Sequence, residues 1–168
     1  MTLRLILMRH AKSDWSLSGD DHDRPLNPRG VRAARALGDW LHSRGHVPKA
    51  ALVSSALRTR QTFDLLGLDI VPQLDPGLYL ADETTLQNAL QDCTDQTVLI
   101  IAHNPGIAGF AADLLASPPP HARFHDYPTG ATLVADFDCK SWAGLRMGTG
   151  HHVDFIVPRE LTDGVARG

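Results

Sequence analysis

Residues 97–102 read Thr-Val-Leu-Ile-Ile-Ala, and His103-Asn104-Pro105-Gly106 follow them directly. An unbroken run of β-branched and aliphatic residues is typical of a strand that is buried on both faces. Asn, Pro and Gly favour a turn after it, and the small residues of segment 107–115 predict a helix that Pro118-Pro119-Pro120 ends. The stretch therefore predicts a strand, a tight turn and a helix, with a histidine at the carboxyl end of the strand.

The same alternation continues along the chain on both sides of this unit. Residues 3–8 form a short apolar run, and Asn27-Pro28 supply an N-cap and a first-turn proline before apolar residues at helical spacing. Ser54-Ser55 are expected to cap a second helix. The remaining elements are expected as strands at 51–53, 70–74, 131–137 and 153–157 and helices at 56–66 and 83–91. This order predicts an α/β protein, a three-layer α/β/α sandwich with a mostly parallel central sheet.

The composition is that of an ordinary globular protein. The chain has 168 residues, of which 43% are hydrophobic and 21% charged, which fits one domain. A formal net charge of −3 gives no broad attraction for nucleic acid, and no apolar run approaches a membrane span or a signal peptide. Cys93 and Cys139 are too few for a disulfide framework and too isolated for a zinc cluster. We therefore expect a cytoplasmic protein without a metal site.

Three segments carry imidazole or guanidinium groups at equivalent places of this predicted fold. Arg9-His10 follow the first strand, Arg58 comes a few residues after the second, and His103 follows the strand at 97–102. The carboxyl ends of parallel strands meet at one edge of a sheet, where ligands of open α/β folds bind. These side chains would form a strongly cationic pocket, and guanidinium groups match phosphoryl oxygens well.

A recognisable pattern surrounds these residues. It consists of Leu7-Met8-Arg9-His10-Ala11-Lys12-Ser13, Ser54-Ser55-Ala56-Leu57-Arg58-Thr59-Arg60-Gln61-Thr62 and Ala102-His103-Asn104-Pro105-Gly106. Shorter segments extend it over nearly the whole chain: Arg24-Pro25-Leu26-Asn27-Pro28-Arg29-Gly30, Leu78-Tyr79-Leu80, Pro128-Thr129-Gly130-Ala131 and Pro158-Arg159-Glu160-Leu161. The chain thereby resembles the histidine phosphatase superfamily and is most similar to its SixA-type phosphohistidine phosphatase branch. The resemblance implies a phosphoglycerate mutase-like fold and a single histidine phosphatase domain over residues 1–168.

The resemblance also implies roles for four residues. His10 would be the nucleophile that accepts the phosphoryl group, while Arg9, Arg58 and His103 would bind its oxygens. A nucleophilic imidazole must be neutral, and nearby guanidinium groups favour the neutral form by repulsion of like charge. The same cations stabilise negative charge on the transferred group, so the scheme needs neither a metal nor another cofactor. Lys12 and Ser13 would either contact the phosphate or shape the loop.

The resemblance favours phosphohistidine on a protein as the substrate, and a histidine-phosphotransfer protein as the partner. One alternative is a small-molecule phosphomonoesterase, and another is a phosphate-binding interaction module that lacks catalysis. The intact set of four residues argues for an enzyme, because binding alone does not require the nucleophile. The acid that would protonate a leaving oxygen is not identified by any motif: Asp82 and Glu83 are candidates, and Asp14 is a third. An imidazole that is already protonated on its other nitrogen leaves as a neutral group, so phosphohistidine would not require that acid.

The remaining histidines and the tryptophans show no pattern that points to a site. We expect His22, His42, His46, His121 and His125 at the surface. Adjacent strand residues point to opposite faces, so His151 and His152 are expected to be structural and not to form a metal-binding pair. Trp15, Trp40 and Trp142 are expected to pack against apolar neighbours.

Overall fold

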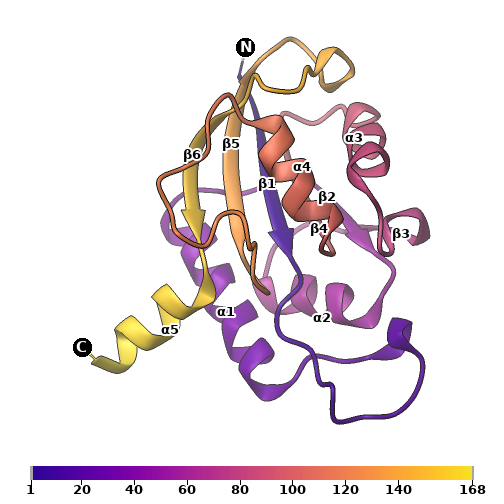
Figure 1. The fold of residues 1–168 in the computed structure, drawn as a ribbon, viewed down its shortest axis with the longest axis vertical. Coiled ribbons are helices and arrows are strands. Elements are labelled where there is room, and N and C mark those ends of the chain that lie inside the picture. Colours follow the sequence, from indigo (N-terminus) through magenta and orange to yellow (C-terminus); the bar gives the residue numbers. More distant parts are fainter. Residues whose placement is uncertain (1, 168) are drawn as a thin grey trace.

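The computed structural model describes residues 2–167, and in that range the chain forms one six-stranded sheet with helices on both faces (Figure 1). The strands are β1 (Thr2–Arg9), β2 (Ala50–Ser54), β3 (Gln73–Asp75), β4 (Thr97–Ala102), β5 (Thr132–Asp138) and β6 (His151–Ile156). The α-helices are α1 (Pro28–Ser43), α2 (Leu57–Leu66), α3 (Glu83–Gln91), α4 (Gly106–Leu114) and α5 (Pro158–Arg167). Short 3-10 turns are η1 (Asp21–Asp23), η2 (Pro76–Leu78) and η3 (Trp142–Gly144).

The strand order of the sheet is β3-β2-β4-β1-β5-β6. The first four strands are parallel, and β5 pairs antiparallel with both β1 and β6. The mostly parallel sheet between helical layers confirms the predicted fold class. It also brings the carboxyl ends of β1, β2 and β4 to one edge, because these strands are direct neighbours that run in the same direction.

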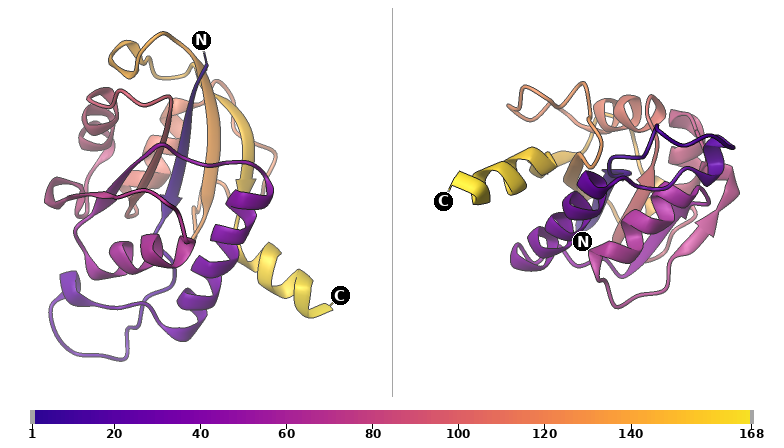
Figure 2. Two further views of the ribbon diagram at one scale, coloured as in Figure 1. Left: turned by 180° about the vertical axis from the view of Figure 1, so that it is seen from behind. Right: turned by 90° about the horizontal axis from the view of Figure 1, so that it is seen from below.

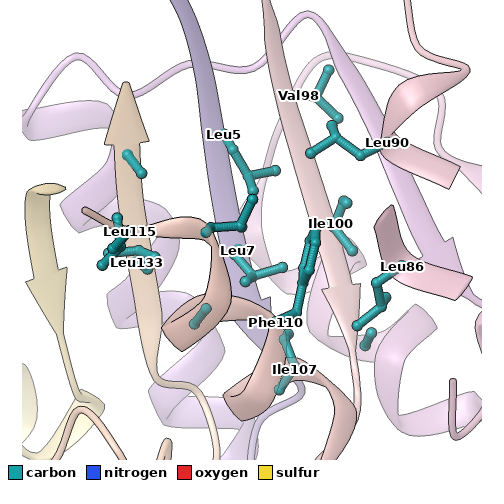
Figure 3. Close-up of a cluster of buried hydrophobic side chains, with 14 of the residues drawn as sticks. Leu5, Leu7, Leu86, Leu90, Val98, Ile100, Ile107, Phe110, Leu115 and Leu133 are labelled. Atoms are coloured by element: carbon teal, nitrogen blue, oxygen red, sulfur yellow. The ribbon is translucent and has the colours of Figure 1, made fainter. Parts of the chain in front are cut away.

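Alternate residues of the central strands build a core on each face of the sheet. Leu5 and Leu7 of β1, together with Ile100 of β4, pack under α3 and α4 (Figure 3). Ile6 and Ile101 point the other way, into the layer formed by α1 and α2, which Figure 2 shows from behind. Burial on both faces explains why these strands are continuously apolar and not alternating.

Two elements differ from the expectation. The third strand is Gln73–Asp75 and not 70–74, at the edge of the sheet beside β2. Pro72 directly precedes it and has no N–H to donate, so the ladder begins after the proline. Helix α5 is not among the expected elements, although Pro158 at its start and Glu160 in its first turn are good helix-start residues. It packs beside α1 and projects away from the sheet (Figure 1).

Candidate active site

His10 lies directly after β1 and is 5% exposed. Its Nδ1 is 2.7 Å from the carbonyl oxygen of Ala11. Since a carbonyl oxygen only accepts hydrogen bonds, Nδ1 carries the proton and Nε2 keeps its lone pair. The Ala11 N–H in turn donates to the Thr62 hydroxyl at 3.0 Å, which ties this turn to α2. The resulting geometry is that of a fixed imidazole with Nε2 as its nucleophilic atom.

The surroundings of His10 keep the ring neutral. Burial is the main cause that lowers its pKa, from 6.5 to about 3. The neighbouring His103, Arg9 and Arg58 lower the pKa further, against the opposing effect of the hydrogen bond to Ala11. The charge repulsion expected from the sequence is therefore present, but burial is the larger cause.

His103 follows β4, and its ring centroid lies 5.4 Å from that of His10. Its Nε2 is 2.7 Å from the hydroxyl of Ser54, the last residue of β2. Its Nδ1 is buried and has no hydrogen-bond partner within residues 2–167. Burial first and then Arg58 lower the pKa of His103 to about 3. The two imidazoles are thus held side by side by the ends of three neighbouring strands.

Arg9 and Arg58 bring two guanidinium groups to the same place. Arg9 ends β1 and donates from Nη1 to the carbonyl oxygen of Tyr127 at 3.2 Å. Its pKa is lowered by burial and by the charge of Arg58. Arg58, in the first turn of α2, is 2% exposed. The Nε atoms of both arginines are buried without a partner in the described part of the chain, which leaves them free to bind an anion.

The structure therefore brings together all four residues that the sequence singled out. It also adds a residue that sequence reasoning missed, Asp21 of η1. Arg58 donates from Nη1 to the Asp21 carbonyl oxygen at 2.7 Å and from Nη2 to its carboxylate at 2.9 Å. Tyr79 and Arg24 also bind this carboxylate, and these contacts hold the pKa of Asp21 well below its usual range, the Tyr79 hydroxyl most strongly. The only sign of Asp21 in the sequence was the group of aspartates in the loop after β1.

Comparison with known proteins agrees with this geometry. The family model described as "Histidine phosphatase superfamily (branch 1)" matches residues 5–79. An uncharacterised protein of Mycobacterium tuberculosis is 33% identical over 159 residues, which cover 90% of this chain and 100% of the relative. The chain belongs to the histidine phosphatase superfamily, branch 1.

Two further relatives place the chain near one part of this superfamily. Phosphohistidine phosphatase SixA of Escherichia coli is 27% identical over 123 residues, covering 67% of this chain and 74% of that protein. The structure of a protein assigned as phosphohistidine phosphatase SixA from Nakamurella multipartitia superposes with a TM-score of 0.81 at 29% identity. That superposition covers 94% of this chain and 97% of the other. The resemblance to SixA-type members is therefore confirmed for both sequence and fold.

Tyr79 completes one wall of this histidine phosphatase site. Its ring lies edge-on to His103, with centroids 5.5 Å apart, and edge-on to His22 at 4.8 Å. The sequence pattern includes Leu78-Tyr79-Leu80 without a role for the tyrosine. Leu80, the next residue, has a φ of 54°, a left-handed conformation that is uncommon for a non-glycine residue. Such strain concentrates at functional sites.

The expected cap at Ser54-Ser55 was wrong. Helix α2 begins after Ala56 and has no side-chain cap. The Ser54 hydroxyl is instead placed at His103, and the Ser55 hydroxyl lies 2.8 Å from Nε2 of His22. Both serines therefore support the histidines of the site, a use that their position before a helix does not reveal.

The other residues named from the sequence divide between the site and its surroundings. Lys12 is exposed and lines a hollow beside the site. Ser13 is buried and accepts a hydrogen bond from Arg24 Nε at 3.0 Å, which shapes the loop. The Asp14 carboxylate accepts from the backbone N–H and the hydroxyl of Ser16. Asp82 caps α3 through the Thr85 N–H at 2.9 Å.

Glu83 remains the acid candidate without a hydrogen bond of its own in the described residues. Its carboxylate packs against α4 so closely that a Cβ on Gly109 would lie 2.0 Å from Glu83 Oε1. None of the three acid candidates forms a hydrogen bond with His10 in the part of the chain that the structure describes. The carboxylate that does reach the cationic pocket is Asp21, and it is ionised.

Two further expectations need correction. His46 is not at the surface: it is 5% exposed, and its Nε2 lies 3.2 Å from Asp154. Trp15 does not pack into a core, since it is 76% exposed and stacks against the Arg24 guanidinium. Among the residues described, no group of three His, Cys, Asp or Glu side chains could hold a metal ion. Within the same residues, no helix combines the length and the apolarity needed to cross a membrane.

Proposed function

We propose that this chain is a protein phosphohistidine phosphatase that works through a phosphohistidine intermediate on His10. The observation that carries the proposal is the tautomer of His10. Its Nδ1–H is bound to Ala11, and its unprotonated Nε2 shares a buried pocket with the cationic groups of Arg9 and Arg58. Phosphoryl transfer needs such a nucleophile next to fixed positive charge.

In the first step, Nε2 of His10 attacks the phosphorus atom in line with the departing group. A new N–P bond forms while the substrate's own bond to phosphorus breaks and its electron pair stays with the leaving group. The guanidinium groups of Arg9 and Arg58 and the imidazole of His103 bind the phosphoryl oxygens, and thereby stabilise the charge of the transition state. Asp21 uses two of the five N–H donors of the Arg58 guanidinium, which leaves the others for the phosphoryl oxygens.

In the second step, water attacks the phosphorus of the intermediate. The bond between His10 Nε2 and phosphorus breaks, its electron pair returns to Nε2, and inorganic phosphate leaves with the oxygen of the water. One proton of that water is released to solvent or to the phosphate. His10 returns to its starting tautomer, because Nδ1 keeps its proton and its bond to Ala11 throughout.

The leaving group favours phosphohistidine over a phosphate ester. An alkoxide needs a proton as it departs, whereas an imidazole protonated on its other nitrogen departs as a neutral molecule. Asp14 and Asp82 are engaged in local hydrogen bonds, and Asp21 is held ionised, so none of them is a good proton donor. Glu83, the remaining candidate, packs against Gly109 of α4 and forms no hydrogen bond with a site residue within residues 2–167. The similarity to proteins named phosphohistidine phosphatase SixA supports the same substrate class, with a phosphorylated phosphotransfer protein as the partner.

The test uses the purified chain, a histidine-containing peptide phosphorylated on its imidazole, and p-nitrophenyl phosphate. We expect the wild type to release phosphate from both and to carry an acid-labile phosphoryl label. His10→Ala should lose turnover and label, because no other group supplies the attacking nitrogen. His42→Ala is the matched control, since this exposed histidine lies on α1 away from the pocket.

Three outcomes would contradict the proposal. A His10→Ala variant that still turns over and carries label would exclude His10 as the nucleophile. Efficient hydrolysis of alkyl phosphates with little action on the peptide would favour a small-molecule phosphomonoesterase. Turnover that disappears in EDTA and returns with a divalent ion would exclude the metal-independent scheme, in which arginines supply the positive charge.

A further inference from the structure

A second cationic region lies beside the site. It is a hollow of about 560 Å³ between the loop after β1, the first turns of α1 and α5, and segment 123–129. Its lining contains the cations Lys12, Arg29, Arg32, Arg123 and Arg159. We call this region the basic hollow. The same lining includes one acidic residue, Asp163.

Part of this positive charge is not neutralised by the protein. Arg159 pairs with Asp163 at 3.1 Å and Arg123 with Asp126 at 3.0 Å. Lys12, Arg29 and Arg32 form no ion pair with any carboxylate in the described residues. All three are exposed, on a chain whose formal net charge is −3. The basic hollow is therefore a local exception to the charge of the whole molecule.

Close backbone contacts fix the basic hollow relative to the nucleophile. Gly30 on α1 lies against Lys12, so that a Cβ at Gly30 would be 2.0 Å from the Lys12 carbonyl oxygen. This contact places the first turns of α1, which carry Arg29 and Arg32, against Lys12, and Lys12 is two residues after His10 in the chain. Gly130, which directly follows the lining residues Pro128 and Thr129, donates its N–H to the His10 carbonyl oxygen at 2.9 Å. The hollow thus lies next to the loop that follows His10.

We propose that the basic hollow binds acidic side chains of the substrate protein that flank its phosphohistidine. This inference rests on the proposed function and adds a determinant of substrate choice. Guanidinium groups bind carboxylates through paired hydrogen bonds. The cations are solvent-exposed and come from four segments, an arrangement that suits several carboxylates on a surface better than one enclosed phosphate. Exposed charge contacts of this kind raise the rate at which partners associate and the selectivity between partners more than they raise affinity.

The experiment compares two phosphohistidine peptides of equal length, one with glutamate and one with glutamine around the phosphorylated residue. We expect the wild type to hydrolyse the acidic peptide with about tenfold higher kcat/KM, mainly through KM, as several weak ion pairs would provide. Raising the ionic strength should shrink this ratio, because exposed charges are screened. The neutral peptide measures phosphohistidine hydrolysis without the acidic side chains. It therefore tests the proposed function separately from the proposed role of the basic hollow.

Charge reversal locates the effect. In Arg29→Glu/Arg32→Glu the acidic-to-neutral ratio should fall to one or below, with cooperative thermal unfolding as the check on folding. Arg35→Glu is the matched control, because Arg35 is exposed on the same helix and does not line the hollow. It should keep the wild-type ratio.

Several results would overturn the inference. If both peptides are hydrolysed equally and without salt dependence in the wild type, the hollow does not select acidic partners, although the proposed function stands. If neither peptide is hydrolysed, the proposed function itself fails. A sugar bisphosphate that is strongly preferred over its monophosphate, without any preference for the acidic peptide, would assign the hollow to a second phosphate of a small molecule.

Discussion

His10 shows how one buried hydrogen bond defines the chemistry of a side chain. The bond from Nδ1 to Ala11 selects the tautomer, and burial removes the competing imidazolium form. Asp21 has the opposite character: it is a permanent anion inside a site built for anions. Its carboxylate occupies one donor of Arg58, while the Asp21 carbonyl oxygen occupies another. The substrate phosphoryl group therefore binds near the protein's own carboxylate, and the two negative charges repel each other.

Asp21→Asn should strengthen the binding of inorganic phosphate. Removing the negative charge abolishes repulsion near the phosphate, while the Asp21 main-chain bond to Arg58 is retained. Two unit charges about 4 Å apart near a protein surface repel each other by about 1 kcal/mol or more. Removing one of them should therefore lower the Kd for phosphate at least about fivefold. Titration calorimetry with phosphate measures it. Asp20→Asn, an exposed neighbour, is the control, and an unchanged or higher Kd in Asp21→Asn would contradict this repulsion.

At the scale of elements, the site depends on how closely helices approach the strand ends. Gly30 lets α1 touch the Lys12 backbone, and Gly106 lets α4 approach Ala81, where a Cβ would lie 1.9 Å from the carbonyl oxygen. In both cases the obstacle is backbone, which cannot rotate away as a side chain can. These glycines therefore serve close approach, since their φ angles lie outside the left-handed region.

Gly30→Ala should destabilise the fold and disturb the nucleophile together. The new methyl group would press on the Lys12 carbonyl, at a cost of about 1–3 kcal/mol that exceeds the gain of up to about 1 kcal/mol in helix propensity. We expect a lower Tm and a lower kcat/KM for p-nitrophenyl phosphate. Gly144→Ala is the control, because no atom lies within 4 Å of the added Cβ. Equal behaviour of the two variants would exclude the steric explanation.

At the scale of the whole molecule, the site lowers the stability of the protein in acid. His10 and His103 are neutral in the folded state down to a pKa of about 3, against an ordinary 6.5. Between these values the unfolded chain binds protons that the folded chain does not. The free energy of unfolding must therefore fall as the pH decreases from about 6.5 towards 3.

The expected slope is at most about 1.4 kcal/mol per pH unit for each histidine. Urea unfolding at a series of pH values measures it, and His10→Ala should show a shallower decline than the wild type. His42→Ala provides the control, because it removes an exposed histidine. The comparison uses slopes, so that the cavity left by His10→Ala does not matter. A decline as steep in His10→Ala as in the wild type would show that His10 is protonated in the folded protein.

The amino-acid sequence by itself determined the layers of the fold and the four residues that its strand ends bring together. Continuous apolar runs report burial on both faces, and a residue directly after a parallel strand has little choice of location. The sequence also sufficed for the family, because its motifs lie at those strand ends. Helix α5 was not predicted: Pro158 and Glu160 are helix-start residues, but the packing of the helix against α1 is a tertiary contact.

Only the tertiary structure decided which polar side chains meet at the site. Asp21 reaches Arg58 across 37 positions and Tyr79 across 58, while Ser54 reaches His103 across 49. Asp21 comes from an irregular loop without hydrophobic periodicity, and Ser54 stood where a helix cap was equally plausible. The partner of a polar side chain depends on how loops close over the sheet edge, and local sequence patterns carry no information about that closure.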